Sequence, residues 1–301
     1  MSDSRVTVSL FGYPMHSGVL NTGVMLFHYG NGGLMRLLVT LSSLRRFYDG
    51  PVLVMLKTKD ECWNYAGHIA KYASVQPFSL ETGGKYAFAN LKPYLLKHTP
   101  FDATLMLDGD LVIRKPIDIL IDSVLGRNLA ALPGGMVMTQ LGKKIVRNDP
   151  CTMKRMETYL PFMDEATKHT LHDIDVPVVN IGVLGYRKDC AWILDEWLDL
   201  MSHNIGGFMN DETTANILTA RHGMTVMPNT WNKSIDPWFD ADSNDNAVIL
   251  HYHGKRHTKH DVCDTGPWWR HLDSMIDAEF PADQIKSFLE MDESLQKGYA
   301  E

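Results

Sequence analysis

The chain of 301 residues lacks long hydrophobic runs, and none of its apolar stretches approaches the ~20 residues that a membrane-spanning helix needs. The first residues, Met-Ser-Asp-Ser-Arg-Val-Thr-Val, also lack the basic and then apolar pattern of a signal peptide. No block of like charge is present, and the formal net charge of −7 argues against a nucleic-acid partner, which would require a basic face. We therefore expect a cytoplasmic protein without a transmembrane segment.

Cysteine is scarce, and its spacing excludes the common cysteine frameworks. The four residues, Cys62, Cys151, Cys190 and Cys263, show neither CxxC pairing nor zinc-finger spacing. We interpret them as reduced thiols. The sequence also shows no internal repeat, no low-complexity segment and no linker. Because 45% of the residues are hydrophobic, the chain can build a sizeable core, and we expect one domain.

Short runs rich in Val, Leu and Ile alternate with helical stretches, most clearly in the first half. The expected strands are residues 6–11, 51–56, 103–107, 129–132, 176–184, 225–227 and 247–252. The expected helices are residues 34–47, 60–72, 89–98, 149–173, 191–203, 211–222 and 268–280. A Gly- and Asn-rich loop is expected before residue 33, and a polar tail after residue 280. This pattern predicts an α/β fold with a mainly parallel sheet covered by helices on both faces. Ligands of such sheets bind beyond the carboxyl ends of the strands.

Two carboxylates directly follow one of the expected strands. Residues 104–113 read Thr-Leu-Met-Leu-Asp-Gly-Asp-Leu-Val-Ile, with Asp108 and Asp110 on either side of Gly109. A nucleotide diphosphate gains negative charge when it leaves, and a divalent cation held by carboxylates stabilises that charge. Oxygen ligands suit Mg²⁺ or Mn²⁺, and Gly109 allows a sharp turn and a close approach of a ligand. The segment therefore predicts a metal site.

Two other interpretations fit the same segment. Asp-Gly between apolar residues is also the strongest short signal for a β-hairpin turn. Residues 108–112 further fit the D-x-D-x-[TV] pattern of haloacid-dehalogenase-type phosphatases, with Asp108 as nucleophile and Asp110 as general acid. That family usually opens its core domain with this strand, whereas about a third of this chain precedes it. Since the family's downstream lysine and acidic pair have no clear counterpart, the phosphatase is the second interpretation.

A cluster of histidines and cations follows the last expected strand. It comprises His251, His253, Gly254, Lys255, Arg256, His257, Lys259 and His260. Imidazole is a good ligand for Mn²⁺ beside carboxylates, Gly254 permits backbone contact with phosphate, and the cations would offset diphosphate charge. Alone, this segment would be interpreted as a solvated basic loop. Together with Asp108 and Asp110 it offers the ligand that completes a metal shell, and the sequence leaves open whether that ligand is His251 or His253.

These two motifs, in this order, resemble glycosyltransferase family 8, the glycogenin and bacterial lipopolysaccharide galactosyltransferase type, which has the GT-A fold. Lys92 precedes Asp108 by an interval similar to that of the family's basic residue. Residues 179–183 (V-N-I-G-V) resemble its N-x-G-V strand, 210–216 (N-D-E-T-T-A-N) its D-Q-x-x-L-N helix start, and 228–232 (P-N-T-W-N) its P-x-x-Y-N turn. The resemblance spans residues 6 to 259.

The resemblance implies roles for individual residues. Asp108 would contact the donor ribose and the metal, with Asp110 and His251 as metal ligands. The other residues implied to bind the nucleotide-sugar donor are Phe11, Gly12, Tyr13, Lys92, Gly182, Gly254, Lys255, His257 and Lys259. The residues implied to act in catalysis at the transferred sugar are Asn180, Asp211 and Glu212. Each of these has a structural alternative, because Asn180 and Gly182 also suit a bulged strand and Asp211 and Glu212 suit a helix start.

Three departures from the family pattern stand out. The family's H-x-x-G-x-x-K-P-W becomes H-Y-H-G-K-R-H-T-K, so the phosphate-binding lysine is displaced or replaced. The usual glutamine is Glu212, which adds a carboxylate beside the anomeric centre. Residues 133–176 are longer than a minimal member needs, which makes them a candidate acceptor-binding or oligomerisation region, although no oligomer is favoured by the sequence.

The sequence thus predicts a GT-A-like domain over residues 1–260, with an insertion at 133–176, and a helical extension over 261–301 packed on it. The expected reaction is transfer of a hexose from UDP-glucose or UDP-galactose, with Mn²⁺ or Mg²⁺, to a hydroxyl of a glycan, a protein or a small molecule. The resemblance implies retention of anomeric configuration. A protein that binds a nucleotide sugar without transferring it is a further alternative.

Overall fold

The computed structural model describes most of the chain. The described residues are 5–8, 21–29, 33–57, 65–81, 91–125, 136–140, 150–171, 178–203, 210–235, 244–253 and 266–298. The expected strand at 129–132 lies outside them. Every structural statement below concerns these residues.

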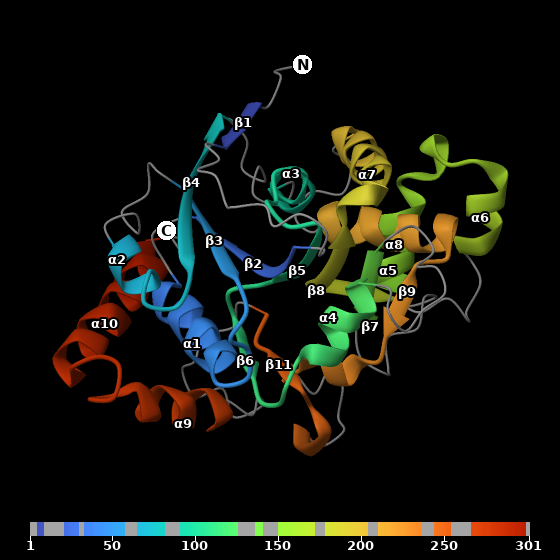
Figure 1. Ribbon diagram of the computed structural model, residues 1–301. Helices are drawn as coiled ribbons and strands as arrows, with labels where there is room; N and C mark the ends of the chain where they lie inside the picture. The colour runs from blue at the N-terminus through green and yellow to red at the C-terminus, as the bar shows by residue number, and fades with distance from the viewer. Residues whose placement is uncertain are drawn as a thin grey trace.

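A mixed sheet of eight strands forms the centre of the molecule, in the order β1-β4-β3-β2-β5-β8-β7-β9 (Figure 1). The strands are β1 (Arg5–Val8), β2 (Thr22–His28), β3 (Val52–Lys57), β4 (Ser74–Glu81), β5 (Ala103–Leu107), β7 (Met136–Gln140), β8 (Val179–Arg187) and β9 (Thr225–Met227). Strands β4, β3, β2 and β5 pair in parallel, as do β7 and β9, whereas β8 runs antiparallel to both of its neighbours and β1 antiparallel to β4. The expected mainly parallel sheet is confirmed.

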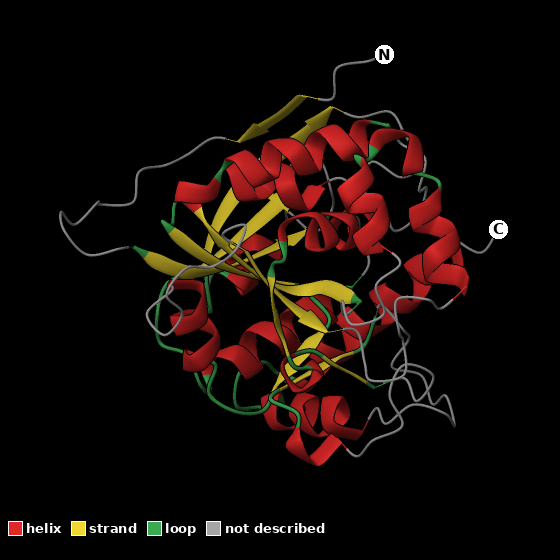
Figure 2. Ribbon diagram, turned by 90° about the vertical axis from the view of Figure 1, so that its right-hand side faces the viewer, coloured by secondary structure: helices red, strands yellow, loops and turns green. Residues whose placement is uncertain are grey.

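Helices cover both faces of this sheet, as Figure 2 shows. One face packs against α1 (Leu34–Arg45), α4 (Asp118–Leu125), α9 (Gly266–Met275) and α10 (Ala282–Gly298). The other packs against α3 (Leu91–Lys97), α5 (Pro150–Glu157), α6 (Glu165–Leu171), α7 (Trp192–Ser202) and α8 (Asn210–His222). Neighbouring residues of one strand enter opposite layers: Leu105 and Leu107 pack with α1, and Met106 packs with α3. Strands buried on both faces explain the continuous apolar runs of the sequence.

A second sheet of three strands begins with β6, the strand that follows the carboxyl end of β5 in the chain. It has the order β10-β11-β6, from β6 (Leu111–Ile113), β10 (Lys233–Ser234) and β11 (Ile249–His251). The outer edge of β6 is held by α1: the Thr40 hydroxyl contacts both the N–H and the C=O of Leu111 at 2.9 Å, and Ser43 accepts the N–H of Ile113 at 3.1 Å. This arrangement fixes the chain immediately after Asp110.

Two central elements differ from the sequence prediction. Residues 22–28, expected in a loop, form the buried strand β2 between β3 and β5. Gly23 in this strand is required by packing, because a Cβ there would lie 2.3 Å from the ring of Phe101. Residues 74–81, where no strand was expected, form β4.

Other boundaries were corrected further along the chain. Where one helix was expected over 149–173, the described residues 150–171 form two helices, α5 and α6, joined by the short 3-10 helix η4 (Leu160–Phe162). The segment 133–176 contributes β7 to the central sheet, so part of it belongs to the core of the fold. The expected polar tail after residue 280 contains α10, whose Ile285 and Phe288 are buried. α2 (Ala66–Ile69) is shorter than the expected helix 60–72, part of which lies outside the described residues.

No described helix combines the length and the apolar character that crossing a membrane would demand.

Candidate metal and donor-sugar site

Asp108 and Asp110 lie in the short connection between β5 and β6. These strands belong to different sheets, so the hairpin interpretation of Asp-Gly is wrong. The backbone of the connection is fixed on both sides, because Asp108 N–H donates to Gly182 C=O at 2.9 Å and Tyr252 N–H donates to Asp110 C=O at 3.1 Å. The chain bends at Gly109 as expected, but its φ is not positive and a Cβ there would make only ordinary contacts with Leu37, so the bend does not require glycine.

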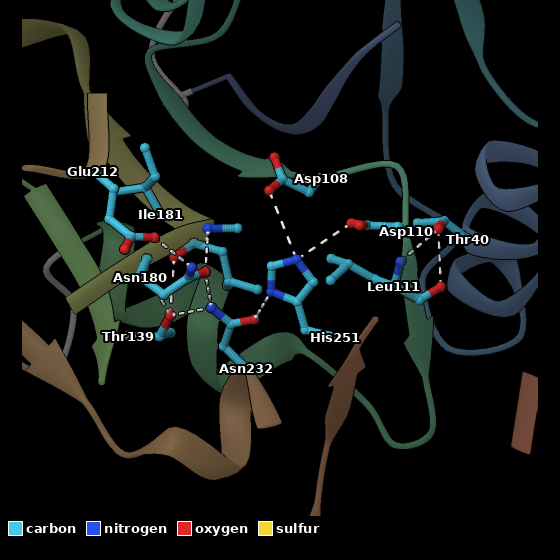
Figure 3. Close-up of polar contacts among 12 residues, drawn as sticks. Thr40, Asp108, Asp110, Leu111, Thr139, Asn180, Ile181, Glu212, Asn232 and His251 are labelled. Atoms are coloured by element: carbon cyan, nitrogen blue, oxygen red, sulfur yellow. Dashed lines mark hydrogen bonds and ion pairs between the residues drawn. The ribbon is translucent and has the colours of Figure 1, made fainter. Parts of the chain in front are cut away.

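Asp108, Asp110 and His251 bring three ligand atoms together within 4.8 Å of one another (Figure 3). The Nε2 atom of His251 lies 3.3 Å from Asp110 Oδ1 and 3.9 Å from Asp108 Oδ2. Burial alone would lower the pKa of His251, but the carboxylate of Asp110 and its hydrogen bond raise it. Burial alone would raise the pKa of Asp110, and His251 lowers it instead. The two groups thus attract each other as an ion pair where a cation would fit.

A chain of buried amides connects His251 to Glu212 (Figure 3). Asn180 accepts the backbone N–H of Gly182 on Oδ1 at 2.8 Å, so its Nδ2 faces Glu212 Oε2, to which it donates at 2.7 Å. Asn232 Nδ2 donates to the same Asn180 Oδ1 at 2.8 Å and to Thr139 Oγ1 at 2.8 Å. Its Oδ1 is thereby directed at His251 Nδ1, 2.9 Å away.

This amide chain determines which ring nitrogen of His251 carries a proton. The backbone N–H of Gly182 can only donate, and this fixes the orientation of Asn180 and then that of Asn232. Because Asn232 Oδ1 can only accept, His251 Nδ1 must carry the hydrogen. In the neutral ring the lone pair is then on Nε2, the atom that faces both carboxylates. The donor set therefore fits a divalent cation.

Gly182 allows the imidazole to sit where it does. A Cβ at this position would lie 2.4 Å from Cε1 and 2.7 Å from Nδ1 of His251, and 2.9 Å from Asn180 Oδ1. Strand β8 is irregular here, because Val137 of β7 pairs with Gly185 and Thr139 pairs with Asn180. The bulged strand considered from the sequence is thus real, and it also brings Asn180 and Gly182 to the site.

Lys92, on α3, is buried and bridges two parts of the site. Its Nζ lies 2.8 Å from Asp108 Oδ1 and donates to Ile181 C=O at 3.0 Å. Burial would lower the pKa of Lys92, but Asp108 and, with it, Asp211 raise it above the ordinary value. The lysine is therefore held in its charged form between carboxylates.

Asp211 and Glu212 are neighbouring acids in the first turn of α8, where Glu212 is buried and Asp211 is partly exposed. Burial, together with Asp108, raises the pKa of Asp211 to about 6, against the effect of Lys92. Burial and the charge of Asp211 raise the pKa of Glu212 to about 7. These carboxyl groups can hold protons near neutral pH, unlike Asp110. Asp211 Oδ1 also accepts the N–H of Glu212 at 2.9 Å, which is the helix-start role considered from the sequence.

Of the two histidines considered as the metal ligand, the structure favours His251. His253 stacks on it with ring centroids 3.9 Å apart and has a φ of 50°, and His251 belongs to the three-residue cluster. The predicted donor residues Phe11, Gly12, Tyr13, Gly254, Lys255, His257 and Lys259 lie outside the described residues.

Four residues at or near the site were given no role from the sequence. Asn232 and Thr139 complete the amide chain, and only the P-x-x-Y-N likeness pointed to Asn232. Tyr29, after β2, has its pKa raised by burial and then by the charges of Asp108 and Asp211, while Arg36 of α1 acts on it in the opposite direction. A strand assignment for residues 22–28 would have placed Tyr29 at a carboxyl strand end, where ligands bind.

No protein-family model matches the chain, and no curated protein sequence matches it. Comparison with solved structures does give matches, and these define the class: the chain has the GT-A fold of glycosyltransferases. The fold expected from the family resemblance is confirmed.

Three solved structures illustrate the likeness. Mouse xyloside xylosyltransferase 1, in its apo form, aligns with a TM-score of 0.53 and 12% identity over 78% of this chain and 98% of that chain. The galactosyltransferase LgtC, solved with donor and acceptor sugar analogues, gives 0.55 and 14% over 86% and 98%. The glycosyltransferase GlyE of Streptococcus pneumoniae gives 0.53 and 14% over 91% and 63%. These matches do not favour the haloacid-dehalogenase alternative.

Proposed function

We propose that this chain is a metal-dependent glycosyltransferase that moves a hexose from a UDP-sugar to a hydroxyl acceptor, with retention of configuration. The observation that carries the proposal is the convergence of Asp108, Asp110 and the Nε2 atom of His251 at the carboxyl end of β5, within the GT-A fold. A divalent cation held there would stabilise the negative charge of the departing diphosphate. Two oxygen ligands and one imidazole suit Mn²⁺ or Mg²⁺.

The chain's own residues divide the remaining work. Lys92 holds Asp108 in place and adds positive charge near the site. Asn232 keeps the hydrogen of His251 on Nδ1, which leaves Nε2 available as a ligand. Asn180, Asp211 and Glu212 would border the transferred sugar, with Glu212 oriented by the amide of Asn180. These assignments follow the donor and catalytic roles that the sequence resemblance implies.

Retention has two chemical routes at this site. In one, a carboxylate of Asp211 or Glu212 attacks the anomeric carbon, UDP leaves, and the acceptor hydroxyl then displaces the enzyme. In the other, the acceptor attacks from the face that UDP leaves. The raised pKa of Glu212, about 7, reduces the fraction of nucleophilic carboxylate at neutral pH. Asp211, whose pKa is about 6, stays mostly ionised at neutral pH and is therefore the better nucleophile of the two in the first route.

The first test is thermal unfolding with UDP and Mn²⁺, separately and together, on the wild type, on Asp110→Ala and on Asp199→Ala. Asp199 is an exposed residue of α7 outside the site and serves as the matched control. A ligand at a hundredfold excess over Kd adds ~2.7 kcal/mol of stability. We expect UDP to stabilise the wild type and Asp199→Ala only when Mn²⁺ is present, and not to stabilise Asp110→Ala.

A second measurement separates transfer from binding alone. UDP-glucose and UDP-galactose are incubated with the protein and Mn²⁺ without acceptor, and released UDP is assayed. Slow hydrolysis that Asp110→Ala abolishes would support an enzyme. Stable binding without release of UDP would support the non-catalytic nucleotide-sugar-binding alternative, and no binding with any metal would overturn the whole proposal.

A further inference from the structure

A pocket lies at the far end of β6 from Asp110. Its volume is about 270 Å³, and none of its lining residues belongs to the metal cluster. The wall is formed by the segment after α1, by the end of β6 and by the first turns of α9. The lining residues are Arg46, Phe47, Val112, Ile113, Arg114, Pro267, Arg270 and His271.

Three arginines from three different elements line this pocket. Arg46 follows α1 and donates to Ser274 Oγ, Arg114 follows β6 and donates to Asn244 C=O, and Arg270 lies on α9. Among the described residues none of the three forms an ion pair with a carboxylate. Like charges around one hollow repel each other, so an anion placed among them would be attracted by all three.

Glu279, an acid that acts on His271 of the pocket wall, is engaged by hydroxyl groups. Glu279 accepts the Ser42 hydroxyl at 2.8 Å and contacts the Tyr72 hydroxyl. His271, whose Nε2 lies 3.0 Å from Ser42 Oγ, is buried, and burial and the Arg46 charge lower its pKa to about 4. The imidazole is therefore neutral at pH 7, and the positive charge of the pocket comes from the arginines.

The composition of the wall indicates the chemistry of the ligand. A carboxylate has two oxygens, which one or two guanidinium groups can satisfy, whereas a phosphate monoester has three terminal oxygens and up to two charges. The partly exposed Phe47 and Pro267 offer an apolar surface for an uncharged body. The volume lies just below the ~300–1,000 Å³ typical of small-molecule sites, which favours a small ligand.

We propose that this arginine pocket binds the phosphate monoester group of a small organic ligand, at a site separate from the metal and donor-sugar site. The three guanidinium groups hold the phosphate, and the apolar wall contacts the organic body. Because β6 runs from Asp110 to this pocket, a bound ligand would contact the strand that carries the metal-binding connection.

The test is calorimetric titration of the full chain in EDTA, which removes metal-dependent nucleotide binding. The probes are inorganic phosphate, glucose 6-phosphate, glucose, and vesicles with and without phosphatidic acid. The variants are wild type, Arg270→Glu and Lys286→Glu. Lys286 is an exposed residue of α10, so its reversal changes the net charge equally without touching the pocket.

We expect glucose 6-phosphate to bind more tightly than inorganic phosphate, and glucose not to bind. Arg270→Glu should weaken binding by about tenfold or more, because a charge-assisted contact becomes a repulsion, while Lys286→Glu should bind like the wild type. Arg270-dependent binding of phosphatidic acid vesicles, with no binding of glucose 6-phosphate, would support the same phosphate site with a lipid as its source. Absence of phosphate binding in every form, or equal loss in both variants, would overturn the proposal.

Discussion

The site contains two groups of carboxylates that behave in opposite ways. Asp110, beside His251, has its pKa lowered despite burial, whereas Asp211 and Glu212 have theirs raised by burial to about 6 and about 7. The first group is ionised and suited to hold a cation. In the second, Glu212 exchanges its proton near neutral pH and Asp211 about one pH unit lower. The groups around a carboxylate, rather than its residue type, set its pKa and therefore decide whether it can hold a cation or a proton.

Lys92 stands between these two groups, and its removal should have the largest effect. Its buried pair with Asp108 contrasts with Lys97, on the same helix, whose pair with Asp195 is exposed. We expect Lys92→Met to destabilise the fold by roughly 3–5 kcal/mol, because Asp108 loses its partner inside the protein. Lys97→Met should cost less than about 1 kcal/mol. Urea unfolding of both variants measures the difference, and equal costs would refute the assignment of Lys92 as the buried bridge.

Gly182 packs against His251, which contacts Asp110, and against Asn180, which contacts Glu212. We expect Gly182→Ala to displace His251 and Asn180, to destabilise the fold by about 1–3 kcal/mol and to weaken Mn²⁺ binding. Gly67→Ala is the matched control, since nothing lies within 4 Å of the added methyl group. Manganese titration followed by electron paramagnetic resonance, with thermal unfolding, checks both outcomes. A Gly182→Ala variant with unchanged Mn²⁺ affinity would contradict the packing argument.

Asn232 contacts the metal-ligand candidate His251 through Oδ1 and the amide of Asn180, which reaches Glu212, through Nδ2. We expect Asn232→Ala to lower Mn²⁺ affinity by about 10–100-fold through loss of the His251 tautomer. Asn216→Ala removes a comparably buried amide that bonds Val179 and Glu212 main-chain atoms and does not touch His251. It should reduce stability and leave Mn²⁺ affinity near the wild-type value. If both variants lose affinity equally, Asn232 has only a structural role.

The last effect concerns Glu212 and depends on pH. The pKa of Glu212 is raised from 4.5 to about 7, so between these pH values the native state holds a proton that the unfolded chain has released. Wild-type stability should therefore fall as pH rises through this window. Glu212→Gln should remove the part of the fall that extends to about pH 7, should leave the part below about pH 6 that Asp211 contributes, and should gain on the order of 2 kcal/mol over the wild type at pH 8. Urea unfolding from pH 4.5 to 8 in EDTA tests this, with exposed Glu290→Gln as the control that should change nothing.

The three metal-ligand candidates could be predicted from the sequence because each stands next to an apolar strand in the chain. Asp108 and Asp110 follow an apolar strand directly, and the second unusual segment supplies His251. The role of Asn232 could not be predicted in the same way. It depends on the N–H of Gly182, fifty positions earlier in the chain, turning Asn180 and then Asn232. No spacing in the sequence encodes such a chain of orientations.

Strands β2 and β4 were not predicted because each contains a residue that disfavours a strand in isolation. β2 contains Gly23, which weakens a strand unless something packs on it, and here the ring of Phe101 does. β4 contains Pro77, which disfavours a strand, yet Pro77 lies just before the residues that pair with β1. α10 lies where a polar tail was expected, although Ile285, Phe288 and Leu289 follow helical spacing.

The hydroxyls of α1 along β6 have a consequence for association between molecules. A strand at the edge of a sheet offers unpaired N–H and C=O groups to other chains, which is a route to aggregation. On β6, Thr40 occupies both groups of Leu111, and Ser43 occupies the N–H of Ile113. Helix α1 therefore seals the open edge of the small sheet with two side chains, and the strand next to the metal ligands is not available as a template for a neighbouring molecule.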